Sequence, residues 1–99
     1  MKIIFKGKEL AVREHRYPNG RIALACYDPE TNEPWAVATV NMPEIDLAED
    51  ELLLKGWSEN EGLPEAFVEA GLVKPTDRVE PISDYVSARV YQLVARENN

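Results

Sequence analysis

The fold is decided by residues 17–27, which read Tyr17-Pro18-Asn19-Gly20-Arg21-Ile22-Ala23-Leu24-Ala25-Cys26-Tyr27. An Asn-Gly pair tolerates the positive φ angles of a tight hairpin, so the first four residues predict a turn. Ile22, Leu24 and Cys26 then place apolar side chains at every second position, which is typical of a strand with one buried face. This stretch therefore predicts the centre of an antiparallel hairpin.

The same alternation continues on both sides of the hairpin. Ile3 and Phe5 share one face of a short first strand, and residues 10–15 alternate on a second strand. A polar connection flanked by prolines, residues 28–34, leads into another alternating stretch, residues 35–41. Met42-Pro43 ends this pattern, because proline cannot donate to a strand ladder. We expect an antiparallel meander of three or four strands.

The second half of the chain gives shorter signals. Residues 51–57 predict a short strand, and residues 73–83, which contain two prolines, predict a surface loop with one short extended piece. Residues 84–96 fit both strand alternation and one helical face. Their three valines and two tyrosines favour a strand.

One helix is expected over residues 63–71. Pro64 fits its first turn and Gly71 fits the left-handed residue after its last turn. Leu63, Phe67 and Ala70 would form the buried face. The fold class is therefore α+β, with an antiparallel sheet of about five strands, the meander first, packed against one short helix.

Length and composition agree with a single domain over residues 1–99. Hydrophobic residues make up 44% and charged residues 29%, which is typical of a globular chain. No apolar run approaches the roughly 18 residues that span a bilayer, and no signal peptide is recognisable at the start. The single cysteine, Cys26, lies in an apolar run and is expected to be buried. These features favour a cytoplasmic protein without membrane attachment.

The net charge of −7 has its origin in one quarter of the chain. Residues 44–69 contain nine acidic residues and one basic residue, Lys55, whereas residues 1–43 contain five acidic and six basic residues. A phosphate backbone would be repelled by this acidic segment, which argues against direct nucleic-acid binding. A basic protein surface would be attracted to it.

Catalytic, metal and phosphate-binding patterns are weak in this sequence. His15 is the only histidine and lies among charges on an expected solvent face, so a surface role is favoured. The five glycines are scattered singly and form no phosphate loop. Four carboxylates within residues 46–51 lack the spacing and the glycine of a calcium loop. We expect no enzymatic activity, no cofactor and no metal.

The stretch Trp57-Ser58-Glu59-Asn60-Glu61-Gly62 is the most distinctive. One interpretation packs Trp57 in the core and uses Ser58 or Asn60 to cap the start of the helix. The alternative is a binding role, with Trp57 as an exposed aromatic anchor. Trp35 allows the same two interpretations.

Residues 40–71 carry a resemblance. The motifs are Asn41-Met42-Pro43-Glu44, then Lys55-Gly56-Trp57-Ser58-Glu59-Asn60-Glu61-Gly62, then Phe67-Val68-Glu69-Ala70-Gly71. Together they resemble an uncharacterised family of small proteins carried by phages, plasmids and conjugative elements of bacteria. The resemblance covers about a third of the chain. It implies an accessory protein of a mobile genetic element, and no activity comes with it.

The leading hypothesis is a non-catalytic accessory protein that binds a protein partner with a basic surface. Inhibition of a host nucleic-acid-handling or defence enzyme is its specific form. The predicted contact residues are Glu49, Asp50, Glu51, Trp57, Glu59, Asn60, Glu61 and Glu65. Two alternatives are a small ligand-binding or enzymatic domain, with a cleft between sheet and helix, and a homodimeric module joined through a strand edge.

Overall fold

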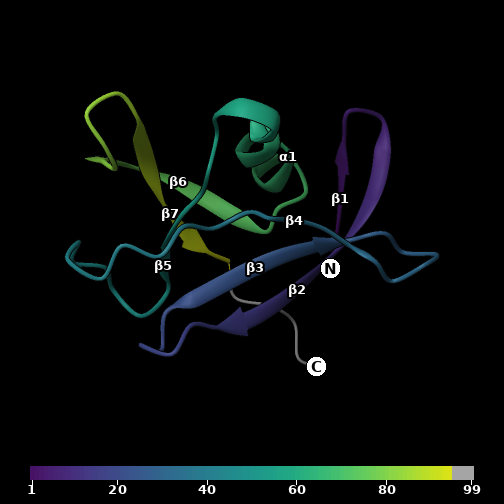
Figure 1. The fold of residues 1–99 in the computed structure, drawn as a ribbon, viewed down its shortest axis with the longest axis horizontal. Coiled ribbons are helices and arrows are strands. Elements are labelled where there is room, and N and C mark those ends of the chain that lie inside the picture. The colour runs from purple at the N-terminus through teal and green to yellow at the C-terminus, as the bar shows by residue number, and fades with distance from the viewer. Residues whose placement is uncertain (95–99) are drawn as a thin grey trace.

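The computed structural model describes residues 1–94, and its first four strands form one antiparallel sheet in chain order (Figure 1). These strands are β1 (Lys2–Phe5), β2 (Lys8–Arg16), β3 (Ile22–Tyr27) and β4 (Pro34–Val37). The predicted turn before β3 is present, with Gly20 at a φ of 88° and its N–H bonded to the Tyr17 carbonyl at 2.8 Å. The predicted meander is therefore confirmed as a four-stranded unit.

Three further strands form a second sheet, so the expectation of one five-stranded sheet is wrong. Its order is β5 (Glu51–Leu53), β7 (Ser87–Leu93) and β6 (Val73–Pro81), with every pairing antiparallel. The chain crosses between the sheets just after β4. The Ala38 N–H bonds to Leu24 of β3 at 2.8 Å, whereas the Val40 N–H bonds to Leu53 of β5 at 3.1 Å. The strand expected over residues 35–41 is shorter for this reason.

Residues 73–81 are a nine-residue strand where a loop was expected, and the prolines explain both the prediction and its failure. A proline cannot donate to a ladder, but it is tolerated at a sheet edge or a bulge. β6 lies at the edge of the second sheet, and its register shifts between Pro75 and Val79.

The strand predicted over residues 84–96 is present but shorter, as β7 (Ser87–Leu93), because residues 84–86 belong to the turn that follows β6. Residues 95 and 96 of that prediction lie outside the described residues. In the turn that joins β6 to β7, the Ile82 N–H donates a hydrogen bond to the Val86 carbonyl at 2.8 Å.

The predicted helix is present as α1 (Leu63–Glu69), preceded by a short 3-10 turn, η1 (Ser58–Asn60). Gly71 has the expected positive φ, 78°, beyond the last helical turn. Leu63 and Phe67 are fully buried, but Ala70 is exposed, because the helix ends before its side chain reaches the core. In residues 1–94 no helix has the length and apolar character that a membrane crossing requires.

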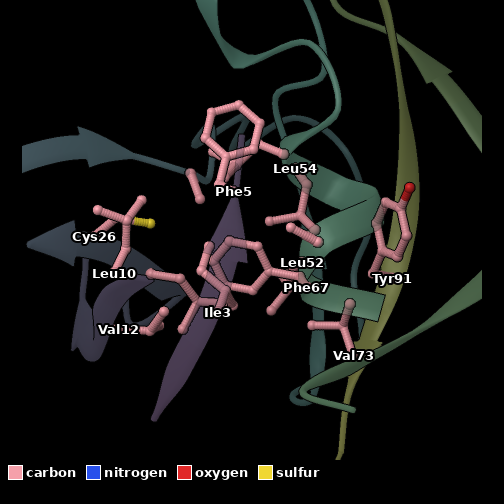
Figure 2. Packing of buried hydrophobic residues seen from close by; sticks show 14 of the residues in the cluster. Ile3, Phe5, Leu10, Val12, Cys26, Leu52, Leu54, Phe67, Val73 and Tyr91 are labelled. Carbon is pink, nitrogen blue, oxygen red and sulfur yellow. The ribbon is translucent and has the colours of Figure 1, made fainter. Parts of the chain in front are cut away.

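The main core joins both sheets through the helix. Figure 2 shows Ile3 and Leu10 from the first sheet facing Phe67 of α1, with Val73 and Tyr91 from the second sheet on the other side. Phe67 has no exposed surface. Because residues from both sheets surround it, the two sheets bury their apolar surface together.

A second, smaller cluster covers the opposite face of the second sheet. Leu53, Val90, Ala88 and Ile45 form it, and Trp57 packs against it. Leu52 and Leu54 point instead into the main core. β5 and the centre of β7 are therefore buried on both faces, whereas most residues of β6 are exposed. Burial on both faces explains why Leu52, Leu53 and Leu54 form an apolar run and not an alternating pattern.

Candidate functional site

Six of the nine carboxylates of residues 44–69 line two cavities that share no residue. Glu49, Asp50 and Glu51 line a cavity of about 670 Å³ that also contains Arg16 and Arg21. Glu61 and Glu65 line a groove of about 800 Å³ together with Glu69. In Figure 1 the loop before β5 lies at the left, whereas α1 lies at the top. The predicted acidic surface is therefore split into a loop group and a helix group.

The loop group is engaged in intramolecular contacts. The Arg78 guanidinium reaches the Glu51 carboxylate at 3.1 Å, the Glu80 carboxylate at 2.9 Å and the Asp46 carbonyl at 2.7 Å. These contacts, first among them the hydrogen bond to Glu80, raise the pKa of Arg78. The Asp50 carboxylate accepts a hydrogen bond from Gln92 at 2.7 Å. These carboxylates fasten the loop to β6 and β7.

Trp57 and Asn60 also have structural roles. Trp57 is half-buried against the second cluster. Asn60 is only 7% exposed, and its side-chain amide donates to the Val37 carbonyl at 3.4 Å. The expected capping of α1 by Ser58 or Asn60 is wrong, because Gly62 occupies the N-cap position and no side chain bonds there. Glu59 is exposed beside Trp57.

The groove beside the helix, here called the α1 groove, is built from four elements, α1, β1, β6 and β7. Residues 4–6 at the end of β1 form one wall, residues 61–69 form the floor, and β6 and β7 contribute residues 75–77, Arg89 and Tyr91. Two aliphatic residues of the α1 groove are exposed to solvent, Ile4 with 62% of its surface and Val68 with 37%. Exposed aliphatic surface inside a groove is typical of a contact site.

The charge of the α1 groove comes mainly from carboxylates. Within residues 1–94 no salt bridge joins Glu61, Glu65 or Glu69 to a basic group. The two bases that line the groove have other contacts. The Lys6 ammonium lies 5.1 Å from the Phe5 ring centroid, and the Arg89 guanidinium donates to the Thr76 carbonyl at 2.7 Å. The helix group is thus free to attract an external cation.

Tyr91 lines the α1 groove, and the neighbouring charges affect the pKa of its phenol. Burial raises the pKa of its phenol, and the Glu65 carboxylate raises this pKa further, while Arg89 opposes the effect. The burial effect is the larger one, so only the smaller contribution of Glu65 to the raised pKa reflects the charge of the groove.

The groups with catalytic potential are not brought together. The Cys26 thiol is fully buried, and desolvation raises its pKa to about 11. The His15 ring is exposed, 3.3 Å from the Tyr27 hydroxyl, on the opposite face of the first sheet from Cys26. A nucleophilic thiol needs a lowered pKa and a nearby base. Among residues 1–94, no group of three or more histidine, cysteine or acidic side chains is placed to hold a metal ion.

The sequence interpretation missed Ile4, Val68 and Glu69 as site residues. A signal for Ile4 exists, because it is apolar at the outward position of a strand whose inward residues are Ile3 and Phe5. Val68 has no such signal, since an apolar residue beside Phe67 suits the core equally well. Trp35 is partly exposed, and its ring packs edge-on against that of Phe5, with 5.7 Å between the two ring centroids.

Comparison with protein-family models, with curated proteins and with solved structures finds no match.

Proposed function

We propose that this protein is a non-catalytic binding module that holds a basic, partly apolar segment of another protein in the α1 groove. The observation that carries the proposal is the pair of exposed aliphatic side chains, Ile4 and Val68, beside three carboxylates that form no salt bridge with any residue in 1–94. Aliphatic contacts would supply affinity, and Glu61, Glu65 and Glu69 would select lysine or arginine and speed association.

The proposed partner still has a basic surface, as predicted, but it contacts the α1 groove and not the whole of the acidic segment. Glu61 and Glu65 remain in the contact set. The loop carboxylates leave it: Asp50 and Glu51 have intramolecular partners, and Glu49 lies beside them in the other cavity. Trp57 anchors the second cluster and is not needed as a contact residue. A mobile-element setting would make a basic groove of a host nucleic-acid-handling or defence enzyme a suitable target, because an acidic protein can occupy the place of a phosphate backbone.

The test uses a random peptide display library panned against the immobilised protein. We expect enrichment of peptides that combine lysine or arginine with aliphatic residues, and weaker binding at high salt because screening shortens the reach of exposed charges. Substitution of Glu61, Glu65 and Glu69 by glutamine should abolish the enrichment. The matched control replaces the same number of loop-side carboxylates, Glu44→Gln, Glu49→Gln and Asp50→Asn, and should leave it unchanged. Equal loss in both variants, or no enrichment of basic peptides, would contradict the proposal.

The volume of the α1 groove favours one second candidate, the binding of a small molecule. About 800 Å³ lies within the range of roughly 300–1,000 Å³ typical of ligand pockets. A thermal-shift screen with cationic metabolites distinguishes the two functions. A ligand at 100 times its dissociation constant should stabilise the fold by about 2.7 kcal/mol.

A further inference from the structure

β1 leaves one edge of the first sheet open. It is the terminal strand in the order β1-β2-β3-β4. The Val12 N–H bonds to the Met1 carbonyl at 2.7 Å, which fixes the phase of the β1–β2 ladder. Hydrogen-bonded and non-bonded pairs alternate in antiparallel strands, so Ile3 and Phe5 bond to β2 while Lys2 and Ile4 do not. The backbone N–H and C=O groups of Lys2 and Ile4 therefore point away from the sheet.

A continuous groove follows this open edge. The α1 groove and a neighbouring groove of about 520 Å³ both include Ile4, Ala66 and Glu69. The helix residues nearest the edge are small, since Ala66 and Ala70 face residues 2–4 in the second groove. A long side chain at either position would fill the space that an added strand needs.

The helix runs beside β1 in the opposite direction. Gly62, at its start, lies close to the Phe5 ring, with 3.6 Å between a Cβ built on the glycine and the ring Cε1. Its last residues, Glu69 and Ala70, lie beside Lys2. Glu65 and Glu69 are one helical turn apart, which is about 6 Å along the axis. Alternate residues of a strand are about 6.6–6.8 Å apart, so two basic side chains on one face of a strand match these carboxylates.

We propose that the bound segment is extended and adds to the first sheet as a strand on β1, with its backbone bonded to Lys2 and Ile4. Its basic side chains alternate with aliphatic ones and face Glu65 and Glu69, while the aliphatic ones contact Ile4. This inference rests on the proposed function and names its recognition mode. Strand addition takes affinity from main-chain bonds and specificity from alternate side chains.

The first experiment uses a capped peptide of about eight residues that alternates lysine and valine, which matches the strand period. Two derivatives carry N-methyl groups on alternate amides, in complementary sets, so that charge and side chains stay the same. Strand addition predicts that one derivative binds roughly tenfold more weakly or worse, because its inward N–H groups are lost, while the other keeps its affinity. Equal binding of both derivatives overturns strand addition but leaves the proposed function intact. Failure of the parent peptide to bind overturns both.

The second experiment measures protection of the backbone amides on the open edge of β1. Amide hydrogen exchange at Lys2 and Ile4 should slow when the parent peptide binds, and the amides of Ile3 and Phe5 should change little. Ile4→Pro removes an N–H that makes no ladder bond, and Ile4→Ala is the matched loss of the side chain. We expect Ile4→Pro to bind roughly fivefold more weakly than Ile4→Ala, the value of one hydrogen bond. Unchanged exchange at Ile4, equal affinities, or edge amides already protected in a dimer of the free protein would each contradict the inference.

Discussion

The two sheets differ in how many of their faces are buried, and this difference governs both the sequence pattern and the site. The first sheet buries one face, with Leu10 and Cys26 inward and Arg13 and His15 outward. In the second sheet β5 and the centre of β7 are covered on both faces, because residues 40–47 and Trp57 pack over Leu53 and Val90. The acidic loop before β5 thus helps to cover a small core through Ile45 and Leu47. Carboxylates in this loop therefore need not mark a contact surface.

Replacing Phe67 with alanine tests whether the two sheets share one core. Phe67 is fully buried between them, so Phe67→Ala should destabilise the protein by about 3–5 kcal/mol. Urea unfolding followed by far-ultraviolet circular dichroism and by tryptophan fluorescence should give coincident transitions. Val68→Ala, its exposed neighbour, should change stability by less than about 0.5 kcal/mol. Two separate transitions in Phe67→Ala would show that the sheets unfold independently.

Leu53→Ala tests whether the second face of the second sheet is a true core. Leu53 is 1% exposed, and its truncation should cost about 2–5 kcal/mol. Val37→Ala is the matched change on the outward face of the first sheet, where the side chain is 46% exposed, and should cost little. The free energy of unfolding in urea measures both. Similar values for the two variants would remove the distinction between the sheets.

Thr39→Val breaks a polar contact at the junction of the sheets. The Thr39 hydroxyl accepts the Leu24 N–H at 3.2 Å and lies 3.0 Å from the Tyr17 hydroxyl, fully buried. The isosteric change should cost about 1–3 kcal/mol, because the Leu24 amide keeps no side-chain acceptor. Faster amide exchange at Leu24 should accompany the loss. Tyr17→Phe removes only the second partner and should have the smaller effect, so the reverse order would refute this role of Thr39.

Asp28→Asn gives the smallest effect, confined to the connection before β4, and it depends on pH. The N–H groups of Glu30 and Thr31, and then Lys8, lower the pKa of Asp28 below its ordinary value of 3.8. A lowered folded-state pKa adds stability that is present above pH 3.8 and is lost as the pH falls through the folded value. Tm measured against pH should therefore favour the wild type at neutral pH and converge with the variant in acid. A constant gap between the two curves would exclude the ionised carboxylate as the cause.

The part of the fold that local pattern controls could be predicted from the sequence. The Asn-Gly turn and the alternation around it indicated the meander, and the proline and glycine at its ends indicated α1. The second sheet could not be derived in the same way, because β6 contains two prolines and β5 pairs with a distant strand, β7. Ile45 was hidden among carboxylates, although it is buried in the second cluster.

The site was harder to predict than the fold, since its parts are far apart in the sequence. Ile4 and Val68 line one groove only because α1 packs beside β1. Charge counting pointed to residues 44–69 but could not separate Glu51, which pairs with Arg78, from Glu65, which has no such partner among the described residues. Which carboxylates are neutralised depends on an arginine that lies 27 positions further along the chain.

The burial of Cys26 makes alkylation of its thiol a probe for opening of the first sheet. This residue is the only cysteine of the chain, and its side chain has no solvent-exposed surface. Because only the thiolate reacts with alkylating reagents, a thiol with a pKa of about 11 stays protected while β3 remains in place. When reclosing is faster than alkylation, the alkylation rate of the native protein therefore measures the population in which the meander is separated from the core, without any introduced label.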